Sequence, residues 1–259
     1  MRAASADLPA GAYTTFRTYG GNRVLHLNRH AQRLRDSLTL LGSAASLSDD
    51  QVRCAVASVL RQTGFAESRF RLTLAAPQAA DMPARLFVSV EPFTPYPSRL
   101  YEEGVMCSTL ALHRDNPHAK STAFIAAAGD AYRALPAGVH EGLMVADDGA
   151  VLEGLSSNFF AVLDGALYTE QERALVGVTQ SLVLELARRL WPALPIHTRA
   201  IHIDDLPRVS ECFITSVSRE VLPVVRIDNL TVGDGRPGPL TRALIAGMRD
   251  WIAREAEPL

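Results

Sequence analysis

The chain has 259 residues, of which 47% are hydrophobic and 21% are charged, and its formal net charge is -2. This composition supports a substantial core in one large or two moderate domains and excludes a disordered, strongly charged chain. The near-neutral balance gives no reason to expect binding to nucleic acid or membranes, and no apolar stretch is long enough to span a bilayer. Three widely spaced cysteines without a Cys-x-x-Cys pattern indicate free thiols in a cytoplasmic protein.

The first part of the chain alternates between strand and helix signals. The stretch 13–19 is rich in strand-forming residues and is followed by a Gly-Gly-Asn turn and a second expected strand over 24–27. Asn28 is expected to cap a helix that Gly42 ends. A capping box of Ser48 and Gln51 predicts a second helix. The further strands expected here are 70–75 and 86–90.

Three prolines within 91–99 indicate an interdomain linker. The sequence therefore predicts a small α+β domain over 1–95 and a larger β-rich domain with packed helices over 96–259, a mixed α+β or α/β class. Strands are expected near 105–112, 143–146, 159–163, 166–168, 212–216 and 222–227, and helices over 121–135, 179–190 and 240–254.

Lys120 is the single lysine of the chain, so arginine supplies 26 − 1 = 25 of the 26 basic residues. A guanidinium keeps its proton near neutral pH and cannot attack a carbonyl, whereas an amine can. Asn116-Pro117 indicates a loop before Lys120, and the expected helix follows it, so the lysine is predicted at a loop-to-helix junction that favours the neutral amine. The alternative is a surface lysine left by drift.

Three polar segments follow. Glu153 precedes a Gly-Leu-Ser-Ser-Asn loop between apolar strands, where a buried carboxylate would need a cationic partner; a surface position in a hairpin is the alternative. Gly177 allows a ligand to approach the backbone closely. Thr179 is expected to cap a helix whose N-terminus suits a phosphate; the alternative is an ordinary capped helix. The hydroxyl groups of the turn 215–218 could donate hydrogen bonds to the same phosphate. The alternative is a polar loop without a ligand.

The order of the motifs HAQRL, Lys120, EGLSSN, LVGVT and TSVSREVLPV resembles the class IV aminotransferases, the fold-type IV pyridoxal-phosphate enzymes. These include branched-chain and D-amino acid aminotransferases and aminodeoxychorismate lyase, and the resemblance runs from Gly11 to about Trp251. It implies a two-domain, homodimeric, cytoplasmic enzyme that binds pyridoxal 5′-phosphate. The implied reaction moves an amino group between a small amino acid or amine and a keto acid.

The resemblance also implies residue roles. Lys120 matches the catalytic Schiff-base lysine, Arg33 the arginine that binds the cofactor phosphate, and Glu153 the carboxylate that pairs with the pyridine nitrogen. Tyr13 and Arg17 are expected to line the substrate pocket. The other implied cofactor contacts are Ser157, Asn158, Leu175, Val178, Thr179, Ser216 and Val217.

The chain departs from the family pattern at several positions. Val217 stands where the family often has threonine, and Ala123 and Phe124 stand where asparagine or tyrosine is common. The stretch 75–85 lacks the Arg-x-His pair with which D-amino acid aminotransferases hold a carboxylate. The alternatives for holding the substrate carboxylate are Arg17, Arg85 and Arg114.

Two other functions stay open at this point. An aminodeoxychorismate lyase, which releases 4-aminobenzoate and pyruvate, would share the cofactor and the early steps, and a non-catalytic scaffold protein is the less favoured third possibility. No metal site is expected, because His26 and His30 lack acidic or cysteine neighbours in sequence. The Gly-x-Gly-x-x-Gly over 233–238 is expected to be a turn, because no second strand follows it to complete a dinucleotide-binding unit.

Overall fold

The computed structural model describes residues 8–43, 45–77 and 84–259. Two compact units divide this chain. The described part of Met1–Pro95, together with Ala119–Ala126 and Trp251–Leu259, forms the first unit, and Tyr96–His118 with Ala127–Asp250 forms the second. The units are therefore not continuous segments, and the division into domains 1–95 and 96–259 stays a prediction.

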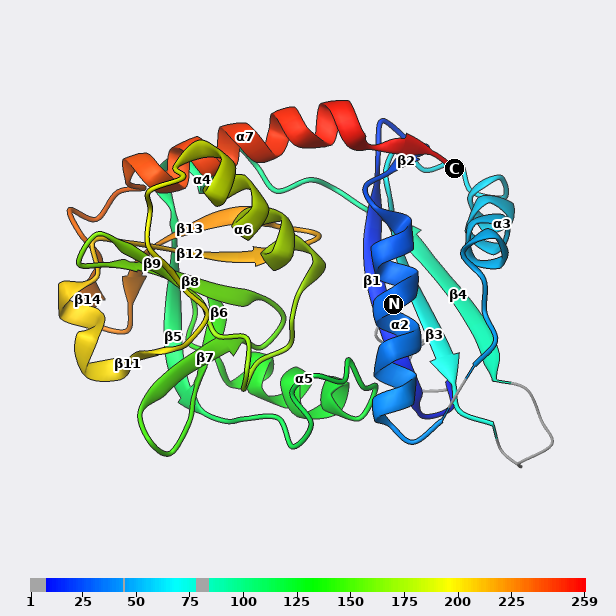
Figure 1. The fold of residues 1–259 in the computed structure, drawn as a ribbon, viewed down its shortest axis with the longest axis horizontal. Helices are drawn as coiled ribbons and strands as arrows, with labels where there is room; N and C mark the ends of the chain where they lie inside the picture. Colours follow the sequence, from blue (N-terminus) through cyan, green and yellow to red (C-terminus); the bar gives the residue numbers. More distant parts are fainter. Residues whose placement is uncertain (1–7, 44, 78–83) are drawn as a thin grey trace. The chain divides into compact units, whose positions relative to one another are not determined.

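The first unit is built on a five-stranded sheet in the order β15-β2-β1-β3-β4 (Figure 1). Along β1, alternate side chains pack under α2, where the Phe16 ring stacks on Phe70 with ring centroids 5.3 Å apart. Tyr13 and Arg17 point to the other face because successive strand side chains alternate. The elements of this unit are β1 (Gly11–Tyr19), β2 (Arg23–Val24), α2 (Leu27–Leu40), α3 (Asp49–Leu60), β3 (Ser68–Ala75), β4 (Arg85–Pro92) and β15 (Glu257–Pro258).

Local signals predict most helix ends in this unit. The capping box of Ser48 and Gln51 opens α3, and Gly42 follows α2 with a left-handed φ of 80°. The start of α2 differs from the prediction: the helix begins at Leu27 after His26, which has a φ of 48°. Asn28 is therefore inside the helix, and the second strand ends at Val24. His26 contacts the Trp251 ring, a tertiary contact that local sequence does not encode.

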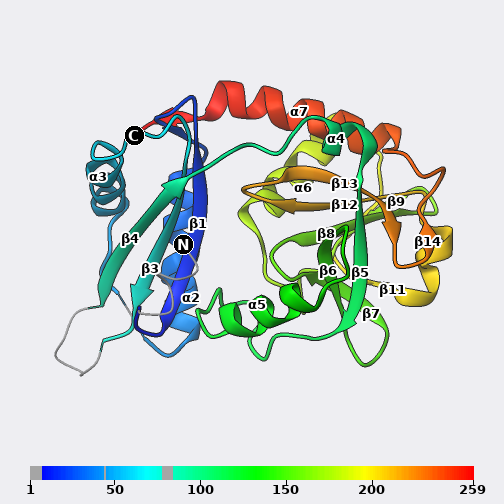
Figure 2. The ribbon, with the colours of Figure 1, turned by 180° about the vertical axis from the view of Figure 1, so that it is seen from behind.

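The second unit contains a ten-stranded sheet that closes on itself. Pairing of β7 with β8 joins β8, β12, β13, β5, β6 and β7 into a ring, and β5 runs beside β13 and β6 (Figure 2). The strands are β5 (Val105–Ala111), β6 (Val139–Val145), β7 (Ala150–Gly154), β8 (Asn158–Leu163), β9 (Ala166–Tyr168), β10 (Ile196–His197), β11 (Ile201–His202), β12 (Glu211–Ser216), β13 (Glu220–Ile227) and β14 (Leu230–Thr231). The helices are α4 (Arg99–Glu103), α5 (Phe124–Ala134), α6 (Val178–Leu190), η1 (Ile203–Arg208) and α7 (Pro239–Glu255), of which α5 and α7 contribute residues to both units.

Buried apolar side chains such as Cys107, Leu143 and Phe159 fill the inside of this ring. Among the described residues, no helix has the length and apolar character needed to cross a membrane.

The predicted glycine-rich turn over 233–238 leads into α7. Glu211 accepts hydrogen bonds from the backbone N–H groups of Leu240 and Thr241 at 3.1 and 2.8 Å, so a carboxylate of this chain occupies the start of the helix. A Cβ added to Gly238 would lie 2.0 Å from the Glu211 carboxyl carbon, which explains the glycine there. This glycine run is a turn that fits against Glu211.

Candidate active site

The Lys120 segment is bound to the edge of β1 in the first unit. Lys120 O accepts a hydrogen bond from Tyr13 N at 2.8 Å, Thr122 N donates to Gly11 O at 2.9 Å, and Ser121 forms an isolated bridge with Ala12. The helix α5 begins only at Phe124, so Lys120 precedes it by four residues, with the Ser121 bridge and a turn between them, and is not at the helix start predicted from sequence. The backbone around Lys120 is thus held to β1 by an isolated bridge with two hydrogen bonds.

The Lys120 amine lies over an aromatic ring. Its Nζ is 4.8 Å from the centroid of Tyr13, and the Arg71 guanidinium carbon is 5.1 Å from the same centroid. The Lys120 amine, the Arg71 guanidinium and the Tyr13 ring therefore lie together on one face of β1. Arg71 was not predicted; the signal available was its position on β3, because it pairs with Thr15 and so shares the face of Tyr13.

Arg33 on α2 is tied to β1 through a hydroxyl. Its Nη2 donates to Thr14 Oγ1 at 2.8 Å, and the same oxygen lies 3.1 Å from His30 Nδ1. Burial lowers the pKa of His30 well below its ordinary value, and the positive charges of Arg33 and Lys120 lower it further. The neutral His30 ring can then accept the Thr14 proton, which leaves Thr14 Oγ1 to accept from Arg33.

The other arginines proposed for a substrate carboxylate have different surroundings. The Arg17 guanidinium lies between two rings, 4.1 Å from the centroid of Tyr19 and 4.8 Å from that of Phe93. Arg85 is exposed. Arg114 belongs to the second unit and bonds to Glu153, so it is already engaged by a carboxylate. Residues 78–83 of the stretch searched for an Arg-x-His pair lie outside the described part.

Glu153 on β7 is a buried carboxylate in an ion pair. Arg114 Nε donates to its Oε1 at 2.8 Å, and the two side chains are 5% and 3% exposed. The hairpin-surface alternative is therefore wrong, and the cationic partner that burial requires is present. Sequence could not name this partner, which lies 39 residues away.

Asn158 and Gly177 together shape the approach to α6. Asn158 Nδ2 donates to Leu175 O at 2.6 Å, and a Cβ on Gly177 would lie 2.1 Å from Asn158 Oδ1. The N-cap of α6 is Gly177, so Thr179 is inside the first turn and the prediction of Thr179 as cap is wrong. The first turn of α6, with Val178 and Thr179, still carries backbone N–H groups that lack a helical acceptor.

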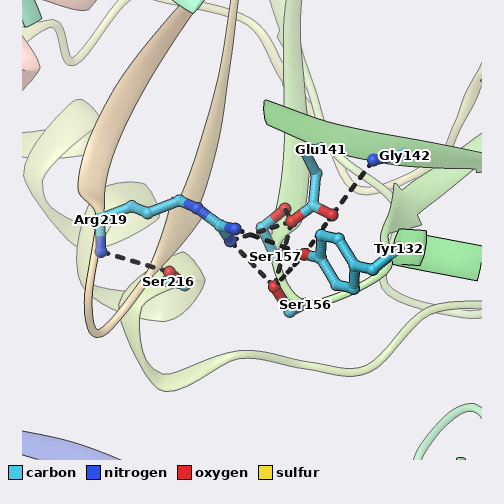
Figure 3. Close-up of polar contacts among 7 residues, drawn as sticks. All are labelled: Tyr132, Glu141, Gly142, Ser156, Ser157, Ser216 and Arg219. Atoms are coloured by element: carbon cyan, nitrogen blue, oxygen red, sulfur yellow. Dashed lines mark hydrogen bonds and ion pairs between the residues drawn. The ribbon is translucent and has the colours of Figure 1, made fainter. Parts of the chain in front are cut away.

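Glu141 on β6 is a second buried carboxylate, and sequence analysis missed it (Figure 3). Its Oε2 accepts from Arg219 Nη1 at 2.9 Å, from Ser157 Oγ at 2.9 Å and from Ser156 Oγ at 3.1 Å. The Tyr132 hydroxyl donates to Oε1. Burial, chiefly, raises the pKa of Tyr132, so the hydroxyl keeps the proton that it donates. An acid inside the apolar strand VHEGLMV was the available signal.

The turn between β12 and β13, residues 217–219, holds the predicted second phosphate loop. Ser216 Oγ accepts from Arg219 N at 3.3 Å, and Thr215 Oγ1 is buried without a hydrogen-bond partner in the described part of the chain. Thr215 lies opposite Asn158 in the sheet, so this turn and the β7–β8 loop, residues 155–157, are neighbours within the second unit.

The predicted site residues thus form two groups. Lys120, Tyr13, Arg17 and Arg33 belong to the first unit, and Glu153, Ser157, Asn158, Leu175, Val178, Thr179, Ser216 and Val217 belong to the second. No cluster of three or more metal-binding side chains occurs among residues 8–43, 45–77 and 84–259.

The sequence profile of the family described as amino-transferase class IV matches residues 11–227. The chain belongs to this family. It is 28% identical over 255 residues to the D-alanine aminotransferase of Bacillus licheniformis, covering 95% of this chain and 88% of the relative. The Escherichia coli branched-chain amino acid aminotransferase structure has a TM-score of 0.80 at 22% identity, covering 96% of this chain and 87% of that one.

A third similar structure, the T.th. branched-chain amino acid aminotransferase with pyridoxamine 5′-phosphate, has a TM-score of 0.81 at 24% identity, covering 94% and 85% of the two chains. The predicted fold-type IV architecture is confirmed. The chain is a pyridoxal-phosphate-dependent aminotransferase, and these comparisons do not favour the lyase.

Proposed function

We propose that this aminotransferase transfers the amino group of a small amino acid or amine to a keto acid, with Lys120 as its catalytic residue. The observation that carries the proposal is the position of Lys120: the single lysine of the chain is held to β1 by an isolated bridge, and its Nζ lies over the Tyr13 ring. Pyridoxal phosphate, when bound, supplies an aldehyde that condenses with amines and a ring that accepts electrons. Lys120 Nζ would condense with that aldehyde with loss of water; once the substrate amine replaced it there, the freed Nζ could move the substrate α-proton as a general base.

The residues of the second unit fit the ring and the phosphate of this cofactor. Glu153, charged through its pair with Arg114, offers an acceptor for the protonated ring nitrogen. The α6 start provides N–H groups beside Gly177, against which Asn158 packs, and the buried Thr215 hydroxyl is next to Ser216. These features support contacts from Ser157, Asn158, Leu175, Val178, Thr179, Ser216 and Val217. For Arg33, on α2 of the first unit, the proposed phosphate contact rests on the family resemblance alone.

For the substrate carboxylate, we propose Arg71 with Tyr13 in preference to Arg17, Arg85 or Arg114. Arg71 and Lys120 stand on the same ring, so an amino acid held by Arg71 would present its amino group near Nζ. Arg17 is only 8% exposed, and its guanidinium lies between two aromatic rings. It is therefore less accessible to a substrate carboxylate than Arg71. Arg17 would then shape the pocket.

We also propose a cytoplasmic homodimer. The three cysteines form no disulfide among the described residues, as in reducing compartments. Leu40 and Leu41, consecutive residues where α2 ends, are exposed apolar side chains that a second copy could cover. Light scattering of the purified holoenzyme at several concentrations tests the dimer, and a mass of one chain would overturn it.

The experiment that tests the function is a donor and acceptor screen of the purified holoenzyme. D- and L-amino acids and achiral amines are supplied with and without a keto acid, and the new amino acid is quantified. We expect turnover only with a keto acid acceptor. Release of pyruvate from aminodeoxychorismate without an acceptor would show a lyase, and no turnover with any donor would contradict the transaminase.

A further inference from the structure

We infer that Arg219 is a positioning residue that fixes the phosphate-binding turn of the cofactor site by tying it to buried Glu141. The inference rests on the proposed function, because it assigns Arg219 a task in that same site. Arg219 lies in the turn that carries Val217 and follows Ser216, and Glu141 on β6 contacts Ser156 and Ser157 of the β7–β8 loop (Figure 3). The ion pair thus links two segments expected to contact the cofactor.

The β12–β13 turn is held through Arg219 at its backbone and at its side chain. Arg219 N donates to Ser216 Oγ at 3.3 Å, and Arg219 O accepts from Tyr101 on α4 at 3.1 Å. The next residue, Glu220, has a φ of 56°, a left-handed conformation that an L side chain adopts only when its surroundings impose it. The turn therefore depends on anchors outside itself, and the Arg219 side chain provides one.

The guanidinium reaches the β7–β8 loop as well as Glu141. Arg219 Nη1 donates to Ser156 Oγ at 2.9 Å, and Nη2 donates to the Tyr132 hydroxyl at 3.3 Å. Ser156 and its neighbour Ser157 both donate to Glu141 Oε2. One carboxylate and one guanidinium therefore fix the loop and the turn together, and Asn158, which orders the approach to α6, follows this loop directly.

The positive charge of Arg219 persists over the working pH range of an enzyme. Burial opposes the charge of Arg219, but Glu141 and Tyr132 outweigh it and raise the pKa of Arg219 above its ordinary value. An ion pair with several hydrogen bonds, buried on both sides, is rigid and directional. Such a pair suits a frame for a phosphate site, where small displacements of N–H groups weaken binding.

If Arg219 sets the phosphate turn, its loss should weaken the hold on the phosphate and spare the rest of the cofactor. We would titrate wild type and Arg219→Met with pyridoxal phosphate and, separately, with pyridoxal, which lacks the phosphate, and follow the visible absorbance. We expect the variant to bind pyridoxal phosphate about ten-fold more weakly or worse, with pyridoxal affinity nearly unchanged. Arg226→Met, an exposed arginine on the same hairpin, is the matched control and should bind both normally.

A single substitution leaves Glu141 buried and unpaired, which can prevent folding. The double variant Glu141→Gln with Arg219→Met removes both charges and should fold, while its affinity for pyridoxal phosphate, but not for pyridoxal, stays reduced. Tyr101→Phe removes only the hydrogen bond to Arg219 O and should reduce the affinity for pyridoxal phosphate by less. Equal weakening of both ligands, or no weakening in the folded double variant, would overturn the inference. If wild type binds neither ligand, the proposed function itself fails.

Discussion

The candidate site residues of the two units differ in the contacts that their charged side chains make. In the first, the contacts described for Lys120, Arg71 and Arg33 are with an aromatic ring and a hydroxyl, and Lys120 and Arg33 are partly exposed. In the second, Arg114 and Arg219 are buried against the carboxylates of Glu153 and Glu141. Aromatic rings and hydroxyls attract cations weakly, whereas buried carboxylates fix them.

This difference indicates that the charged site residues of the two units have different roles. In the first unit the Lys120 amine and the Arg71 guanidinium lie over the Tyr13 ring, whereas in the second the buried arginines are paired with buried carboxylates. The predictions below test that difference by removing one group at a time.

Lys120→Arg should have the largest effect. The arginine keeps the charge over the Tyr13 ring but cannot bond to the cofactor aldehyde, so kcat should fall by at least about three orders of magnitude. Circular dichroism and the Tm should stay near wild type, since only the side-chain end changes. Turnover close to wild type would remove Lys120 from the chemistry.

Glu153→Gln should damage both stability and activity, because it leaves Arg114 buried without its carboxylate. We expect a loss of about 3 kcal/mol in the free energy of unfolding, measured with urea. Adding Arg114→Met should restore most of the stability but not kcat, since the negative charge that favours a protonated ring nitrogen stays absent. Recovery of activity in the double variant would show that the pair only supports the fold.

Gly177→Ala should place a Cβ 2.1 Å from Asn158 Oδ1 and displace the start of α6. We expect a cost of about 2 kcal/mol in stability together with weaker binding of pyridoxal phosphate, measured by titration. Gly64→Ala is the matched control, because an added Cβ there meets nothing within 4 Å. An unchanged cofactor affinity in Gly177→Ala would argue against a phosphate contact at α6.

His30 should make the first unit sensitive to acid. Its folded-state pKa is lowered, chiefly by burial, so the unfolded state binds more protons once the pH falls below about 6.5. The free energy of unfolding should therefore decrease with falling pH, by up to about 1.4 kcal/mol per pH unit in that window. His30→Gln should lose this component; an identical pH dependence in both proteins would show that the buried ring does not contribute.

The sequence predicts what depends on neighbouring residues and misses what depends on distant ones. The capping box of Ser48, the glycine after α2 and the role of Lys120 as the single lysine are all local or compositional signals. The partners of Glu153 and Glu141 lie 39 and 78 residues away, so spacing along the chain cannot identify them.

The errors have the same origin. Asn28 has a side chain that could cap a helix, but α2 starts one residue before it, at Leu27, where the preceding His26 contacts Trp251. Thr179 is a good capping residue, yet α6 begins two residues earlier than a cap at Thr179 would allow, after Gly177, which fits closely against Asn158. Tertiary packing prevails over capping preference at both positions.

The most direct test of Lys120 is borohydride reduction of the enzyme saturated with pyridoxal phosphate, followed by peptide mapping. Because the chain has no other lysine, the chain's α-amino group is the one competing primary amine. We predict loss of the visible absorption band and a single pyridoxyl label on the peptide that contains Lys120. A label elsewhere, or none after saturation, would contradict the assignment of Lys120 as the cofactor-binding residue.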